Sequence, residues 1–295
     1  MTSGDEVFRQ IQKKARAASA TEGRPAPTAE YLTRHALESF LDRLTRTAHK
    51  NDFVLKGGIL LAVYGVRRPT KDVDAEAIRA TVTPEAIARV IRDVAEVQAP
   101  DGLDFDLDTM RVQEIREQAD YPGLRMRVTT RIGSQKTVVA WDISTGDPIV
   151  PSPKPVKVPR ILGDAIEILG YAPETTVAEK GVTILERGIT STRWRDFIDI
   201  VQLAARHDID QEQLLESARA VARYRKVELV PISPVVEGYG AIGQTKWAAW
   251  RRKEGLEDIS EADLDDQMAK VAEVIDPVFS HGPGTASAKA SPTGI

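Results

Sequence analysis

The sequence predicts an α+β protein with a mixed sheet and flanking helices in its N-terminal half and a helical C-terminal half. Short apolar segments, several of them with alternating polar residues, occupy most of the chain before residue 148. Apolar residues at helical spacing dominate after residue 160. Between the two lies PIVPSPKPVKVP, Pro148–Pro159, whose five prolines leave little capacity for helix or sheet. We therefore interpret this stretch as a connection across the surface.

These patterns divide the chain into four expected parts. Residues 1–27 form a flexible N-terminal segment that ends in the linker-like stretch TEGRPAPTAE. Residues 28–160 form a domain that contains all the expected strands, and residues 161–277 form a helical domain. Residues 278–295, which include HGPGTASAKASPTGI, have the composition of a disordered tail.

Each expected element rests on a local pattern. Tyr31–Thr47 carries apolar residues at helical spacing, and Pro84 stands at a helix start, where proline is tolerated. The other expected helices are Ile59–Tyr64, Pro173–Glu186, Thr192–Arg206, Gln211–Tyr224, Gln244–Arg252 and Glu261–Ile275, with Pro84 leading a helix to about Val97. The expected strands are Phe53–Leu55, Val73–Ala77, Leu103–Leu107, Arg111–Ile115, Leu124–Ile132 and Thr137–Ile143.

The composition excludes several classes of protein. Of 295 residues, 42% are apolar, which is enough for a sizeable core. The absence of cysteine excludes disulfides and thiolate metal sites. We find neither the apolar run of a secretory signal nor a stretch approaching the roughly 20 apolar residues of a membrane span. We therefore expect a cytoplasmic protein without a membrane partner.

The charge is unevenly distributed. A net charge of −4 argues against a generally basic nucleic-acid binder, yet four local clusters are basic. Such a cluster can bind phosphates or can simply be a solvated face. The clusters are Arg125, Arg127, Arg131 and Lys136; Lys154, Lys157 and Arg160; Arg223, Arg225 and Lys226; and Lys246, Arg251, Arg252 and Lys253.

A pair of glycines stands between an expected strand and an expected helix. Gly57 and Gly58 follow the apolar strand and precede Ile59–Tyr64. This geometry lets backbone N–H groups approach a phosphate, and Lys56 adds positive charge. A plain tight turn explains the two glycines equally well.

A pair of aspartates begins the next expected strand. Asp72 and Asp74 are two residues apart, so they lie on one face of a strand and repel each other. Mg²⁺ takes carboxylate oxygens together with substrate phosphates and would offset this repulsion. Asp142, in the otherwise apolar TVVAWDI, is the best candidate for a third ligand. The alternatives are that the pair caps a turn and that Asp142 merely ends its strand.

The order of these parts resembles the nucleotidyltransferase fold, and the chain is similar to the AbiE-type nucleotidyltransferase toxins of bacterial type IV toxin–antitoxin pairs. The matching pieces are KGGILL at 56–61, RPTKDVD at 68–74 and AEKGVTILERGITSTRWRDFIDI at 178–200. The resemblance implies that residues 28–160 form the catalytic domain. It also implies catalytic roles for the lysine of AEK, Lys180, and for the second aspartate of RDxxD, Asp199, beside Asp72 and Asp74. Asp196 is left in a supporting role.

The resemblance further implies a reaction and its cofactors. Asp72, Asp74 and Asp142 would hold Mg²⁺ or Mn²⁺, and an NTP would be bound by Lys56, Gly57, Gly58, Arg68 and Lys71. The acceptor would be RNA, most specifically the 3′ end of tRNA, so that transfer blocks aminoacylation and translation. A cognate antitoxin is the expected protein partner. Two other functions stay open: an enzyme of this fold that places AMP on a protein, and a non-catalytic RNA-binding protein.

Overall fold

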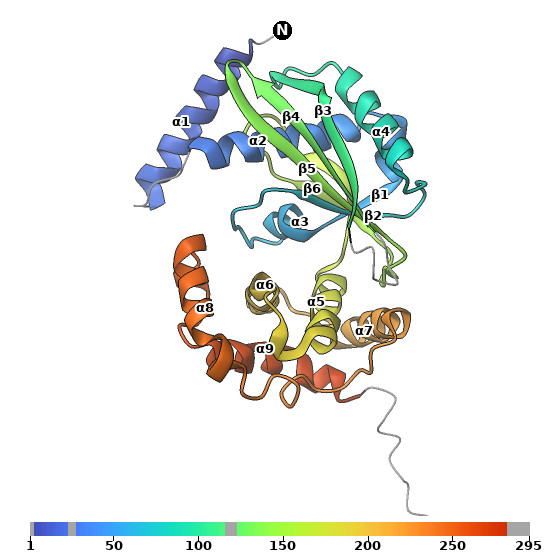
Figure 1. Ribbon diagram of the computed structural model, residues 1–295, viewed down its shortest axis with the longest axis vertical. Coiled ribbons are helices and arrows are strands. Elements are labelled where there is room, and N and C mark those ends of the chain that lie inside the picture. Colours follow the sequence, from blue (N-terminus) through green and yellow to red (C-terminus); the bar gives the residue numbers. More distant parts are fainter. Residues whose placement is uncertain (1–2, 23–27, 116–122, 282–295) are drawn as a thin grey trace, which may run out of the picture. The chain divides into compact units, whose positions relative to one another are not determined.

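A computed structural model of the chain describes residues 3–22, 28–115 and 123–281. The chain divides into two compact units (Figure 1). The first comprises Met1–Asp147 and Ser152–Ala172, and the second comprises Pro148–Pro151 and Pro173–Ile295. No helix within the described ranges is both long enough and apolar enough to cross a membrane.

The first unit is built on a mixed sheet with the strand order β3-β4-β5-β2-β1-β7-β6. β2 runs parallel to β5 and β1 runs parallel to β7, whereas the other neighbours are antiparallel. This arrangement confirms the predicted mixed sheet. The strands are β1 (Phe53–Lys56), β2 (Val73–Ala77), β3 (Leu103–Ile115), β4 (Gly123–Ile132), β5 (Gln135–Thr145), β6 (Lys154–Val158) and β7 (Ile166–Gly170).

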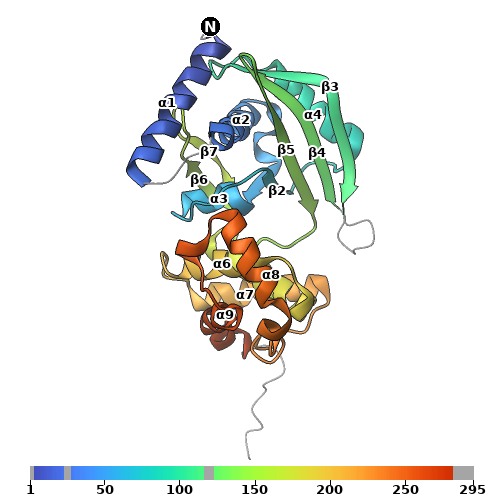
Figure 2. The ribbon, with the colours of Figure 1, turned by 60° about the vertical axis from the view of Figure 1, so that its left-hand side comes forward.

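The helices of the first unit are α1 (Gly4–Glu22), α2 (Thr28–Leu44), α3 (Gly57–Val63) and α4 (Pro84–Glu96), with a short 3-10 helix at Ala48–Asn51. α2 packs on β5 and α4 packs on β3 (Figure 2). The core between them contains Trp141 of β5, whose ring lies 5.3 Å from that of Phe40 and 4.6 Å from that of Phe53. Burial of these aromatic rings stabilises this layer.

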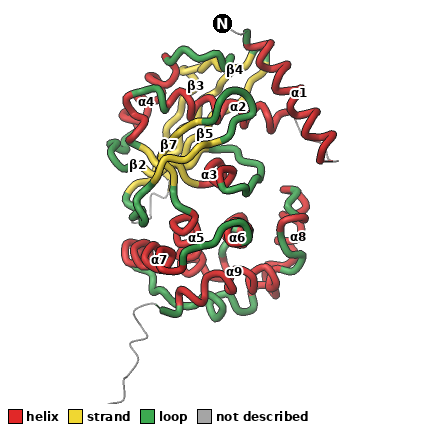
Figure 3. Tube along the Cα trace, turned by 180° about the vertical axis from the view of Figure 1, so that it is seen from behind, coloured by secondary structure: helices red, strands yellow, loops and turns green. Residues whose placement is uncertain are grey.

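The described part of the second unit is helical (Figure 3). Its aromatic cluster joins α6 to α8: the Trp194 indole donates to Tyr239 Oη at 2.7 Å, and the rings of Trp247 and Trp250 stack 5.5 Å apart. The helices are α5 (Pro173–Arg187), α6 (Trp194–Ala204), α7 (Gln211–Arg225), α8 (Tyr239–Glu254) and α9 (Leu264–Phe279), with 3-10 helices at Gly188–Thr190 and Glu257–Ile259.

The structure differs from the sequence prediction at the N-terminus. Gly4–Glu22 is a helix, so the prediction of a flexible segment over residues 1–27 was wrong for this stretch. Val7, Ile11 and Ala15, spaced four residues apart, are buried along one face of the helix. Residues 23–27 and most of the expected tail, residues 282–295, lie outside the described residues.

The proline-rich connection also differs from its prediction. Lys154–Val158 forms β6, which pairs antiparallel with β7, a strand that the sequence did not indicate. β6 is an edge strand, and an edge strand tolerates Pro155 because one side of it needs no ladder hydrogen bonds. The two strands predicted at Leu103–Leu107 and Arg111–Ile115 are one strand, β3, with a register shift between Asp106 and Arg111.

Candidate active site

The turn from β1 into α3 brings the backbone against the acidic pair. Gly57 adopts a φ of +66°, which favours glycine, and a Cβ at this position would lie 1.9 Å from Asp74 Oδ2. A Cβ on Gly58 would lie 2.2 Å from Thr70 Oγ1. Each glycine therefore lets the start of α3 approach the segment that carries Asp72 and Asp74 more closely than any other residue would.

The strand register places four charged residues in one row across the sheet. Asp74 lies opposite Lys56 of β1 on one side and opposite Asp142 of β5 on the other, and Asp142 lies opposite Arg125 of β4. Directly opposed residues of neighbouring strands point to the same face. The row therefore has two carboxylates at its centre and a cation at each end, and it unites Asp74 with Asp142 as the sequence predicted.

The carboxylates influence each other electrostatically. Burial raises the pKa of Asp74 most, and the negative charges of Asp72 and Asp142 raise it further, to about 7. Lys56 and Arg68 act in the opposite direction and do not cancel the increase. A bound cation would stabilise the ionised form of such a carboxylate strongly, because its positive charge offsets both the desolvation penalty and the repulsion.

The donor chemistry at Asp72 and Asp74 fits a magnesium ion. Mg²⁺ in phosphate-transfer sites is commonly held by one or two carboxylates together with substrate phosphates. The third expected ligand has another partner here, because Arg125 donates to Asp142 from Nε at 2.7 Å and from Nη2 at 2.5 Å. Within the described ranges no three His, Cys, Asp or Glu side chains are grouped closely enough to hold a metal ion. The role of Asp142 as a metal ligand stays a prediction.

Glu76 is a member of the site that sequence reasoning missed. Its side chain is 1% exposed and accepts a hydrogen bond from Lys56 Nζ at 3.1 Å. Ser144 Oγ and the Asp147 backbone N–H also donate to it, at 2.6 and 3.1 Å. Glu76 thus fixes the position of Lys56, the lysine expected to contact the nucleotide. The sequence pattern that could have indicated Glu76 is its spacing: it follows Asp74 by two residues, so it lies on the same face of the strand.

The other two cations expected at the nucleotide lie in the loop before β2. Arg68 is partly buried, and its charge acts on Asp74. Lys71, next to Asp72 in the chain, is exposed. Both residues lie in the segment that precedes the acidic pair. A triphosphate bound there through a metal would need positive charge to offset its own negative charge.

A second cluster of charges lies in the second unit. Lys180 of α5 forms ion pairs with two aspartates of α6, Asp196 and Asp199, and its Nζ lies 3.0 Å from Asp199 Oδ2. Asp199 is fully buried, and Asp196 also accepts a hydrogen bond from Arg193 Nε at 2.6 Å. Burial raises the pKa of Asp196, but Lys180 and Arg193 outweigh it and hold this pKa well below its usual range. Both aspartates therefore hold Lys180.

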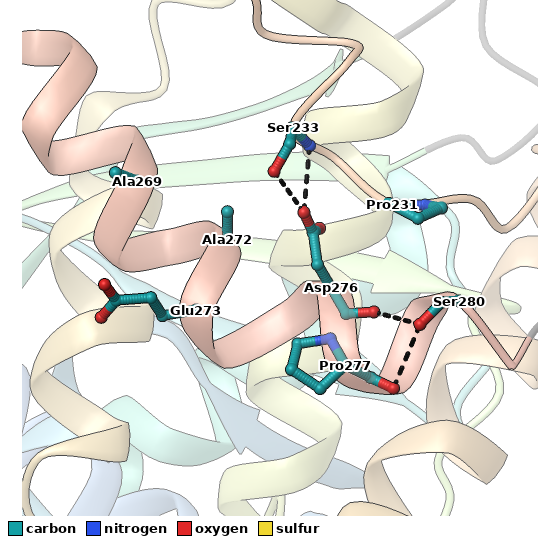
Figure 4. A pocket seen from close by; sticks show the side chains of 8 residues that line it. All are labelled: Pro231, Ser233, Ala269, Ala272, Glu273, Asp276, Pro277 and Ser280. Carbon is teal, nitrogen blue, oxygen red and sulfur yellow. Dashed lines mark hydrogen bonds between the residues drawn. The ribbon is translucent and has the colours of Figure 1, made fainter.

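A pocket of about 600 Å³ in the second unit has no cluster of catalytic side chains like the carboxylate row or the Lys180 cluster (Figure 4). Of its two acidic residues, Glu273 and Asp276, the second accepts a hydrogen bond from the backbone N–H of Ile232 at 2.6 Å and another from the backbone N–H of Ser233 at 3.3 Å. Asp276 thus serves to hold this loop against α9. The carboxylate row of the first unit and the Lys180 cluster of the second remain the candidate catalytic groups.

A mixed sheet in which a glycine pair lies against an acidic pair is the arrangement that the sequence led us to expect of a nucleotidyltransferase fold. Residues 39–275 match the family described as the nucleotidyl transferase AbiEii toxin of a type IV toxin–antitoxin system, and the chain belongs to this family. It is therefore a nucleotidyltransferase toxin, and membership implies an NTP, a divalent metal and an antitoxin partner.

Three solved structures are similar to the chain at low identity. JHP933 from Helicobacter pylori is 14% identical with a TM-score of 0.47, covering 84% of this chain and 91% of its own. A protein from the same organism described as a candidate nucleotidyltransferase is 15% identical, with a TM-score of 0.49 and coverage of 84% and 94%. An antigenic nucleotidyltransferase-like protein from Paracoccidioides brasiliensis is 13% identical, with a TM-score of 0.41 and coverage of 83% and 94%. None of the curated proteins compared with the chain matched it.

Proposed function

We propose that this toxin transfers a nucleoside monophosphate from an NTP to the 3′ end of tRNA, which blocks aminoacylation and stops translation. The observation that carries the proposal is the opposition of Asp74 and Asp142 beside Gly57, in a chain of the AbiEii family. The acidic pair Asp72 and Asp74, next to a close backbone turn, suits a metal–triphosphate complex. The tRNA acceptor follows from the resemblance to the AbiE-type toxins.

Asp72 and Asp74 would hold the metal, Mg²⁺ or Mn²⁺. When bound, the metal supplies charge that neutralises and orients the triphosphate. Asp142 is the third ligand or the base that receives the proton of the acceptor hydroxyl. Lys56, Arg68 and Lys71 offset the charge of the phosphates, and the backbone N–H groups at Gly57 and Gly58 donate to them.

The transfer itself is an in-line displacement. The oxygen of the acceptor hydroxyl forms a bond to the α-phosphorus, and the bond from that phosphorus to the oxygen that bridges it to the β-phosphorus breaks. The electron pair of the broken bond leaves with pyrophosphate, and the hydroxyl proton passes to a carboxylate or to water. The resemblance to the AbiE-type toxins also implies catalytic roles for Lys180 and Asp199, and within the second unit Asp199 and Asp196 hold Lys180 in position.

The partners follow from this reaction. The acceptor is tRNA and the donor is an NTP, so we place the enzyme in the cytoplasm, where both are found. A cognate antitoxin neutralises the toxin, as the type IV family implies. The proposal includes no membrane partner.

The acceptor is tested by incubating the purified protein with Mg²⁺ and each labelled NTP, with total tRNA and a mixture of proteins as parallel acceptors. We expect label at the 3′ end of tRNA from at least one NTP. We also expect Asp72→Ala to abolish labelling without loss of fold, because removing one of two repelling carboxylates relieves repulsion. Label on protein alone would instead identify an AMPylating enzyme, and full labelling by the Asp72→Ala variant would contradict the assigned site.

A further inference from the structure

One face of the strands β3, β4 and β5 is open to solvent and carries arginines. The helices that pack on these strands are α1, α2 and α4, and the side chains that face them include Leu124, Met126 and Val128 of β4, all buried. The residues between these on β4 point to the opposite face. They are Arg125, Arg127, Thr129 and Arg131, three of which belong to one of the basic clusters in the sequence.

One of these arginines faces another arginine on the neighbouring strand. Arg111 of β3 lies directly opposite Arg127 of β4, and both side chains are exposed. Like charges in this arrangement destabilise a pair of strands. Neither arginine forms an ion pair within the part of the chain that the structure describes. Arg111 Nη1 donates to the backbone carbonyl oxygens of Asp108 and Met110, at 3.3 and 2.8 Å, so its hydrogen bonds leave its positive charge in place. The pair therefore has the charge to bind an anion.

The cationic area borders the carboxylate row. On β4, Arg125 is two residues from Arg127, and it belongs to the row that contains Asp142 and Asp74. Toward the other end of the sheet the charge is neutralised, because Arg131 lies 3.7 Å from Asp106. Arg125 is also neutralised, because it forms an ion pair with Asp142. Arg111 and Arg127 therefore lie between two ion pairs, and Arg127 is two residues along β4 from the row that contains Asp142 and Asp74.

We propose that this open face, centred on Arg111 and Arg127, binds the phosphate backbone of the RNA acceptor. The inference rests on the proposed function, in which the acceptor is RNA. Guanidinium groups bind phosphate oxygens through two parallel hydrogen bonds and stack on unpaired bases. A chain with a net charge of −4 has little general attraction for RNA, so a local surface has to supply it.

The test compares two double variants by tRNA binding, measured as fluorescence anisotropy between about 50 and 200 mM salt. Arg111→Gln/Arg127→Gln should weaken binding roughly tenfold at the lowest salt and flatten the salt dependence, because two phosphate contacts are lost. The matched control, Arg89→Gln/Arg92→Gln, removes two exposed arginines from α4, the helix that packs on β3 from the other side. It should bind tRNA like the wild type.

Kinetics separate this role from a structural one or from NTP binding. The Arg111→Gln/Arg127→Gln variant should raise the KM for tRNA and leave the KM for NTP and the kcat at saturating tRNA unchanged. Equal tRNA affinity of the two double variants, or a higher KM for NTP alone, overturns the inference while the proposed function stands. A wild-type protein that neither binds nor labels tRNA overturns both.

Discussion

Asp74 is the residue whose chemistry depends most on its surroundings. Burial and the charges of Asp72 and Asp142 raise its pKa to about 7, from an ordinary value of 3.8. In the metal-free protein, the folded state therefore binds a proton at this position over a pH range in which the unfolded chain does not. By linkage, the wild type loses stability as pH rises from about 4 to about 7, and the loss is complete above the folded-state pKa.

This linkage predicts the behaviour of Asp74→Asn, which resembles the protonated carboxyl group and cannot ionise. The unfolding free energy of the variant relative to the wild type should rise with pH, by up to about 1.4 kcal/mol per unit between pH 4 and 7. The measurement is denaturant unfolding of both proteins at several pH values, with a chelator present to exclude metal. A difference that stays constant across this range would show that Asp74 ionises in the fold as readily as in the unfolded chain.

Single residues also mark how far the sequence could predict the site. The spacing of Asp72 and Asp74 and the position of Asp142 in an apolar strand were visible, and the structure brings Asp74 and Asp142 together. The partner of Asp142, Arg125, could not be read from the chain, because their opposition depends on the register of β4 and β5. Glu76 was visible in the pattern of β2, but only its contacts with Ser144 and Lys56 show its role.

At the scale of elements, the junction of β1 and α3 controls the site. In a Gly57→Ala variant the alanine has to adopt a φ of +66°, and its Cβ would lie 1.9 Å from Asp74 Oδ2. Asp74 therefore has to move. We expect the rate of nucleotide transfer to fall about 100-fold, since displacement of a catalytic group by about 1 Å can cost that much. Stability should also fall, by at least the roughly 1–2 kcal/mol of a left-handed alanine.

A matched control separates the backbone strain from the contact. Gly255 has a similar φ of +65°, and a Cβ there would meet nothing within 4 Å. Gly255→Ala should therefore lose only the stability associated with the backbone conformation and keep its transfer rate. The measurements are thermal unfolding and the labelled-NTP assay for both variants. Equal rates of transfer in the two variants would contradict the role of the Gly57 turn.

Elements also differ in how well the sequence predicts them. The β1–α3–β2 segment was expected within a few residues because its turn residues and apolar runs are distinct. The prolines of Pro148–Pro159 concealed β6, since proline usually excludes a strand and only its edge position makes Pro155 acceptable. α1 was missed because its buried side chains, such as Val7 and Ile11, are widely spaced among polar residues.

At the scale of the whole molecule, the class of fold followed from the sequence, and the order of the strands did not. An α+β architecture with a helical C-terminal half was predicted from periodicity, and the structure confirms it. Placing β2 between β1 and β5 requires pairings between residues about 70 positions apart, such as Asp74 with Asp142, which local patterns do not encode. The family match then adds the activity that a fold alone does not give.

The central claim is that Asp72 and Asp74 hold the metal that carries the nucleotide. Its most direct test is diffraction from crystals soaked with Mn²⁺ and an NTP analogue that cannot react, recorded where manganese scatters anomalously. We predict an anomalous peak at coordination distance from carboxylate oxygens of Asp72 and Asp74, with the triphosphate beside it. A bound triphosphate whose manganese peak lies away from both side chains would contradict the account.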